Sequence, residues 1–202
     1  DAITDLGVLI SSDMKPSSQC LRVAASAQKM LSIIKLAFRY LDITGLTTLY
    51  KAFVRPLLEY CSVTWSPYYI KDIEVIEKVQ RRFTRFLPEF RHLPYEDRLK
   101  CYNLSSLHSR RLFIDLTYVF KIVKGFIQID PDSLFNFSIN SKTRGHKYKI
   151  TGFCSRLDTR KHWFSSRVVP LWNSLPPSCV DCSSVESFKK LLSDYFRLLE
   201  MK

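Results

Sequence analysis

Residues 71–86 constrain the fold more than any other segment, because their apolar side chains recur at steps of three and four. The series consists of Ile73, Ile76, Val79, Phe83 and Phe86. This spacing places the series along one side of an α-helix. Such a helix must cover its apolar side with other elements, so the sequence predicts a helical core around it.

Comparable helical patterns occur at 18–40, 44–60, 95–102 and 106–124. Thr44 is expected to cap the second of these helices. Pro56 is expected to kink or interrupt the same helix, because proline has no N–H to donate. Gly125 suits the C-cap of the last helix. The chain is therefore expected to be mainly α-helical as far as residue 126.

The two ends of the sequence differ from this helical middle. Residues 6–10 are rich in leucine and β-branched side chains and predict a short strand. Residues 143–156 alternate basic with other residues, as an irregular pair of strands would. Ser183 and Glu186 match a capping box that opens a terminal amphipathic helix.

These patterns predict a mainly α fold in three parts. Residues 1–12 carry the strand, 13–126 form a helical bundle, and 127–202 form a less regular basic segment. That last segment contains the small β element and ends in a helix. Because the chain starts next to a strand without an initial methionine, we expect it to be a fragment of a longer protein.

The charge is strongly positive, with 31 Lys and Arg against 19 Asp and Glu and a net charge of +12. A positive field attracts polyanions. Nucleic acid is favoured over an anionic membrane, because no helical pattern combines a basic face with a free apolar face. No apolar run approaches the roughly 20 residues that span a bilayer, and no secretory signal is visible, so an intracellular protein is expected.

Basic residues interleaved with aromatic residues suggest a nucleic-acid-binding surface, because cations contact phosphates and aromatic rings stack on bases. The candidate binding residues are Lys78, Arg81, Arg82, Arg85, Arg144, Lys147, Lys149, Arg160 and Lys161. Acidic residues early and arginines late in 71–86 also complement the helix dipole, so part of this layout has a structural reason. Trp163 and Trp172 are expected to be core residues rather than stacking platforms. Arg110 and Arg111 have two open interpretations, nucleic-acid binding or pairing with Asp115.

The sequence contains no recognisable catalytic or metal site. Asp130 and Asp132 flank a proline and are interpreted as turn residues, since no third carboxylate accompanies them. Cys179 and Cys182 have metal spacing but lack a second ligand pair at a common zinc spacing. The expectation is no catalytic residue, no metal ligand and no cofactor.

Two segments carry a family resemblance: LEYCSVTWSP at 58–67, followed by IEKVQRRFTR at 76–85. Together they resemble the region after the catalytic core of non-LTR retrotransposon (LINE-type) reverse transcriptases. TRGH at 143–146, FSSRVVPLWNSLP at 164–176 and SFKKLL at 187–192 resemble the carboxy-terminal segment of jockey- and CR1-like elements. The order of the blocks is more specific than any single block.

The resemblance implies that 1–12 end the polymerase palm and that 13–126 form the thumb, which holds the template–primer duplex. Lys78, Arg81, Arg82 and Arg85 would make that contact. The catalytic aspartates of such enzymes lie upstream, so this fragment would not be an enzyme, and the Mg²⁺ would belong to the parent polymerase. The implied partners are an RNA template, a DNA primer or target, and the palm and fingers of the same polypeptide, in the nucleus.

Two other interpretations remain open. The chain is alternatively a helical interaction or structural module, or a decayed retroelement remnant, whose basic surface binds no specific nucleic acid. A small free-standing enzyme ranks last, because no cluster of carboxylates or nucleophiles was found.

Overall fold

The computed structural model describes the chain except residues 1, 39, 41, 139–144, 153–154 and 201–202. The fold is mainly α-helical with a short antiparallel pair of strands at the N-terminus, which confirms the expected fold class. The chain forms two compact units, unit 1 (residues 1–111) and unit 2 (residues 112–202).

A β-hairpin opens unit 1. Strand β1 (Ala2–Asp5) pairs with β2 (Val8–Ser11), and Ile3 lies opposite Ile10. Leu6 and Gly7 form the turn with φ angles of 43° and 81°. A two-residue hairpin loop requires such positive φ angles, so the strand predicted at 6–10 was wrong in its first two residues.

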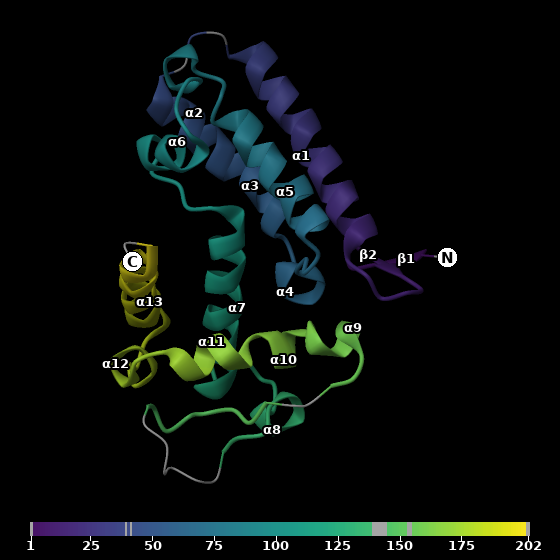
Figure 1. The fold of residues 1–202 in the computed structure, drawn as a ribbon, viewed down its shortest axis with the longest axis vertical. Helices are drawn as coiled ribbons and strands as arrows, with labels where there is room; N and C mark the ends of the chain where they lie inside the picture. The colour runs from purple at the N-terminus through teal and green to yellow at the C-terminus, as the bar shows by residue number, and fades with distance from the viewer. Residues whose placement is uncertain (1, 39, 41, 139–144, 153–154, 201–202) are drawn as a thin grey trace. The chain divides into compact units, whose positions relative to one another are not determined.

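The helices of unit 1 follow the predicted segments closely (Figure 1). They are α1 (Ser17–Ala37), α2 (Ile43–Leu49), the π-helix η1 (Tyr50–Val54), α3 (Arg55–Glu59), α4 (Ser62–Trp65), α5 (Ile70–Phe83), the 3₁₀ turn η2 (Pro88–Phe90), α6 (Tyr95–Cys101) and the start of α7 (Leu107–Val123). Helix α1 packs along α3 and α5. The cap of α2 is Asp42, whose carboxylate accepts the Gly45 N–H at 2.9 Å, and not Thr44 as predicted.

The regular α-helix is interrupted just before Pro56, as expected, because the π-helix η1 separates α2 from α3. The turn before it is a π-helix, in which the Arg55 N–H bonds to the Tyr50 carbonyl. Pro56 then occupies the first turn of α3, where its missing N–H costs no hydrogen bond.

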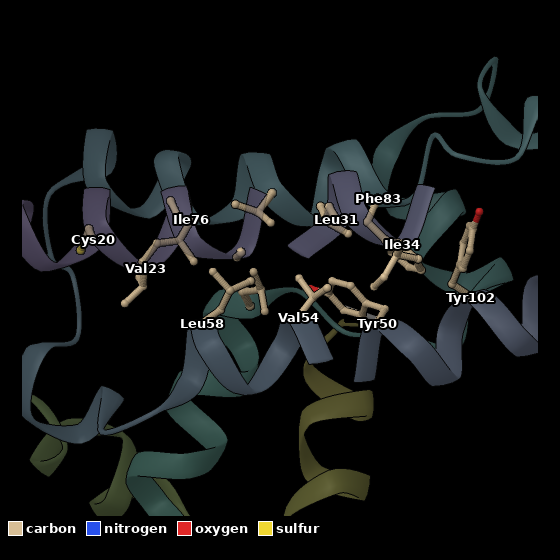
Figure 2. Close-up of a cluster of buried hydrophobic side chains, with 14 of the residues drawn as sticks. Cys20, Val23, Leu31, Ile34, Tyr50, Val54, Leu58, Ile76, Phe83 and Tyr102 are labelled. Carbon is tan, nitrogen blue, oxygen red and sulfur yellow. The ribbon is translucent and has the colours of Figure 1, made fainter. Parts of the chain in front are cut away.

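The core of unit 1 confirms the predicted apolar stripe of α5. Ile76, Val79 and Phe83 are completely buried. They belong to one hydrophobic cluster with Leu31 of α1 and Tyr50 of η1 (Figure 2). The Tyr50 and Phe83 rings stack with centroids 4.2 Å apart.

Unit 2 takes in the rest of α7 and a series of mostly short helices. These are α8 (Pro131–Leu134), α9 (Asp158–Lys161), α10 (Phe164–Arg167), α11 (Val169–Ser174), α12 (Pro177–Val180) and α13 (Val185–Glu200). Its core centres on Phe120, Trp172 and Phe188, and the rings of Phe120 and Phe188 stack at 4.2 Å. Gly125 ends α7 with a φ of 71°, as predicted for a C-cap.

Several expectations for unit 2 need correction. Among the described residues, the β element is reduced to one bridge between Phe137 and Ile150. The cap of α13 is Ser184, which accepts the Ser187 N–H at 3.1 Å, one residue later than the predicted box.

The division between the units falls at 111/112, inside α7, rather than at 126/127. Leu107 at the start of α7 belongs to the first core, whereas Leu116, Val119 and Phe120 belong to the second. A single amphipathic helix thus contributes to both cores, and no linker composition marks the boundary.

Candidate nucleic-acid interface

Helix α5 and the turn after it bring four predicted binding residues onto one surface. Lys78, Arg81, Arg82 and Arg85 follow one another at i, i+3, i+4 and i+7, and all are exposed. We call these four residues the basic helix face. The spacing aligns them on one side of a helix.

The opposite sides of α5 are anchored by polar as well as apolar contacts. Gln80 is completely buried: its amide oxygen accepts the Tyr50 hydroxyl at 2.7 Å, and its amide nitrogen donates to the Ser105 carbonyl at 3.0 Å. Glu77 is 5% exposed and accepts the Leu107 N–H at 3.1 Å. These bonds fix the rotation of α5 about its axis and therefore hold the basic helix face towards solvent.

Other contacts position the cations themselves. The guanidinium of Arg81 lies 5.1 Å from the centre of the Tyr95 ring. Arg82 donates a hydrogen bond to the side-chain oxygen of Gln28 on α1. In the part of the chain that the structure describes, none of the four residues of the basic helix face forms a salt bridge. Their charge therefore remains available to an external anion.

Two further arginines raise the positive potential here and were missed in the sequence. Arg91 is exposed and donates to the Arg85 carbonyl at 3.0 Å. Arg98 is buried and donates to the Thr84 hydroxyl at 3.0 Å. Burial, and then the nearby charge of Arg85, lower the Arg98 pKa from its ordinary value. The density of arginines at 81–98 was the only available signal for these neighbours.

The remaining predicted residues belong to unit 2 and lie on two separate elements. Lys147 and Lys149 lie in the segment at 145–150, where Lys147 and Lys124 approach the Tyr148 ring at 5.2 and 4.6 Å. Arg144 lies outside the described residues. His146 is buried, with its Nε2 atom 2.9 Å from the Trp172 carbonyl, so it packs in the core.

Arg160 and Lys161 are exposed on α9, close to an aromatic residue whose burial was predicted wrongly. Trp163 is 49% exposed, whereas Trp172 is completely buried as predicted. The two tryptophans bound the stretch at 163–172, which was interpreted as apolar and aromatic as a whole, so their different exposures were not predicted.

Arg110 fits neither of its two predicted roles. Its guanidinium forms a two-point ion pair with Glu59, with one N···O distance of 2.9 Å. Asp115 instead binds Arg167, with both N···O distances at 2.9 Å. The pairing of Arg110 bridges residues 51 apart in sequence, which no local spacing rule detects.

The described residues show no arrangement for metal chemistry. Among them, no group of three or more His, Cys, Asp and Glu side chains could hold a metal ion. Asp130 accepts the Asp132 N–H at 3.1 Å, as expected for a turn residue. Burial raises the pKa of the Cys179 and Cys182 thiols, and the Cys182 sulfur donates to the Cys179 carbonyl at 3.0 Å.

Within the described ranges, every helix is too short or too polar to cross a bilayer. No protein-family model, no curated protein and no solved structure matches this chain.

Proposed function

We propose that this chain is a non-catalytic, nucleic-acid-binding segment of a LINE-type RNA-directed DNA polymerase, and that the basic helix face contacts the template–primer duplex. One observation carries the proposal: four exposed cations share one side of α5 and form no described salt bridge. A protein that binds nucleic acid without regard to sequence needs such a surface.

The dimensions of the basic helix face suit a phosphate backbone. Lys78 and Arg82 lie four residues apart in α5, where a helix rises about 1.5 Å per residue, so they span about 6 Å; Arg85, in the turn after α5, extends the face further. One strand of a duplex presents a phosphate about every 3.4 Å along its axis. The face can therefore reach about three consecutive phosphates of one strand.

The resemblance of 58–67 and 76–85 to reverse transcriptases supplies the rest of the proposal. The ligand would be an RNA template paired with a DNA primer, and the protein partners would be the palm and fingers of the parent polypeptide. The Mg²⁺ of the reaction would be held by that parent polymerase, acting in the nucleus. Lys147, Lys149, Arg160 and Lys161 would add phosphate contacts from unit 2, as would Arg144.

Binding of the purified chain to an RNA–DNA hybrid, followed by fluorescence anisotropy at increasing salt, tests this function. Replacing both Arg82 and Arg85 by Ala should lower the affinity at least tenfold. The slope of log K against log salt should shrink by about 2, because each lost phosphate contact removes about 0.9 from it. The charge-matched control is Lys189→Ala with Lys190→Ala, two exposed lysines on α13, which should change binding little.

Three results would contradict the proposal. A slope of log K against log salt near zero, or no binding at about 50 mM salt, would show that the chain does not contact phosphates. A fall of several kcal/mol in the unfolding free energy of the Arg82 and Arg85 double variant would show that these arginines are structural. Primer extension by the chain with magnesium would show that it is catalytic.

A second function, a helical interaction module, is favoured by exposed apolar side chains on unit 1. Phe53 of η1 and Leu57 of α3 are 52% and 36% exposed and lie one turn apart. If this function is the right one, the arginine variant should bind the hybrid like the unaltered chain. Replacing Phe53 and Leu57 by Ser should instead abolish association with a protein partner.

A further inference from the structure

We propose that Trp163, Arg160 and Lys161 form a binding site for single-stranded nucleic acid, in which the indole stacks on an unpaired base. The inference rests on the proposed function only in sharing nucleic acid as the ligand class. It gives Arg160 and Lys161, which only add phosphate contacts in the proposed function, a site of their own for another form of the ligand. In the proposed function, the basic helix face contacts a duplex through its phosphates alone.

The three tryptophans of the chain differ sharply in their environments. Trp65 and Trp172 are 5% and 0% exposed, and their indole N–H groups donate to the carbonyls of Tyr60 and Tyr148 at 2.8 Å. Trp163 is 49% exposed, and the described residues offer its indole no hydrogen-bond partner. A large aromatic side chain that is half exposed leaves apolar surface in water, which a stacked base would cover.

Two cations lie within one turn of this indole. Arg160 and Lys161 are exposed on α9, and the backbone N–H of Trp163 bonds to the Arg160 carbonyl at 3.3 Å. Asp158, exposed on the same helix, opposes them with one negative charge. Burial, and then the charge of Lys161, lower the pKa of His162 from its ordinary value, which favours its neutral form. The local charge is therefore positive.

The backbone that carries Trp163 is held in place from inside unit 2. Arg167 donates to the His162 carbonyl at 3.2 Å and binds the carboxylate of Asp115 at 2.9 Å. The Ser166 and Arg167 N–H groups bond to the Trp163 carbonyl at 3.0 and 2.8 Å. The site is thus pre-organised, which lowers the entropic cost of binding.

A single strand matches this site better than a duplex does. In a duplex the faces of the bases are stacked on one another, whereas an unpaired base presents its face to an aromatic ring. Cations beside the ring then contact the adjoining phosphates.

Intrinsic fluorescence tests the inference directly, because Trp163 is the exposed tryptophan. The full chain is titrated with an oligothymidylate of about 20 nucleotides and, separately, with a blunt RNA–DNA hybrid. Stacking should quench the emission with oligothymidylate. Trp163→Ala should lower the affinity for it at least fivefold without changing the salt slope, while Trp163→Phe should retain most of the affinity.

Lys161→Ala should behave differently, reducing the salt slope for oligothymidylate by about 0.7, the value for one phosphate contact on a single strand. Lys190→Ala is its charge-matched control. Because Trp163 and Lys161 are exposed, both variants should unfold at the same denaturant concentration as the unaltered chain.

The results separate this inference from the proposed function. Equal oligothymidylate affinity of Trp163→Ala and the unaltered chain would overturn the single-strand site, even if the hybrid still binds through Arg82 and Arg85. Absence of oligothymidylate binding would also overturn the single-strand site. A role of Trp163 in binding a protein partner would give this result. If the chain binds oligothymidylate through Trp163 but does not bind the hybrid, the single-strand site is supported. Only the proposed contact between the basic helix face and a duplex is then contradicted.

Discussion

Glu77 and Leu107 are joined directly, although 30 residues separate them: both carboxylate oxygens of Glu77 accept the Leu107 N–H, at 3.2 and 3.1 Å. The bond ties α5 to the first turn of α7 and satisfies a helix N–H that has no partner within its own helix. Tyr95 donates its hydroxyl to the same carboxylate. The burial of Tyr95 raises the pKa of its phenol, so it remains a donor at neutral pH.

Replacing Glu77 by Ala should lower the unfolding free energy by about 3 kcal/mol, because two buried donors would lose a charged acceptor. Urea denaturation measures the change. Glu74→Ala, at an exposed position of the same helix, is the control and should stay within about 0.5 kcal/mol. Equal effects of the two variants would show that the Glu77 bonds contribute nothing specific.

Replacing Pro56 by Ala should alter the unfolding free energy by less than about 1 kcal/mol. In the middle of a regular α-helix, proline costs about 3 kcal/mol, and its removal would stabilise the protein by that amount. The π-turn at Tyr50–Val54 has already relieved this conflict, since Pro56 lies in the first turn of α3. Glu74→Pro, inside α5, is the contrasting variant and should lose about 3 kcal/mol or more.

The ion pair of Asp115 and Arg167 should be costly to break from one side. The two side chains are 4% and 15% exposed, so removing the carboxylate leaves a largely buried guanidinium. Asp115→Ala should destabilise the chain by about 3–5 kcal/mol. A double-mutant cycle with Arg167→Ala should show that the two losses are not additive; additive losses would mean that the pair is energetically uncoupled.

The buried thiol of Cys20 should make the stability of the fold depend on pH. Burial, and then the charge of Asp72, raise the pKa of the Cys20 thiol to about 12. A thiol whose pKa is higher in the folded state than in the unfolded state stabilises the fold at pH values below its unfolded pKa of about 9. That stabilisation is lost as the pH rises towards 12. Stability should therefore fall across this alkaline range, and Cys20→Ala should flatten the fall in chemical denaturation series.

The same burial protects Cys20 from alkylation. Cys61 and Cys101 are exposed, so iodoacetamide at pH 8 should label them rapidly and label Cys20 only after unfolding. Mass spectrometry of peptides after timed labelling distinguishes the sites. Labelling of Cys20 at the rate of Cys61 would contradict the buried position.

The sequence predicted the helices well because helix formation depends on near neighbours. Ile76, Val79 and Phe83 repeat at helical steps, and the core contains all of them. Caps were less predictable: Asp42 and Ser184 stand one or two residues from the expected positions. Several polar residues lay close to each helix start, and their side-chain oxygens compete for the same free N–H groups.

The burial of polar groups in α5 could not be predicted. Asp72, Glu77 and Gln80 have the composition of a solvated helix face, yet all three are buried. Their partners come from distant segments: Ser17 donates to Asp72 at 2.6 Å, and Tyr50 donates to Gln80. Trp163 illustrates the reverse case, an aromatic residue that remains half exposed in the structure.

By itself, the sequence determined the helical class, the apolar stripe of α5 and the surplus of positive charge. These follow from residue type and spacing, which act over one or two turns of the chain. Only the tertiary structure decided that the polar residues Glu77 and Gln80 of α5 are buried, because they form hydrogen bonds with Tyr50, Ser105 and Leu107. It likewise decided that Arg110 pairs within the fold while Arg82 and Arg85 remain exposed, since an ion pair needs a partner that folding alone brings near.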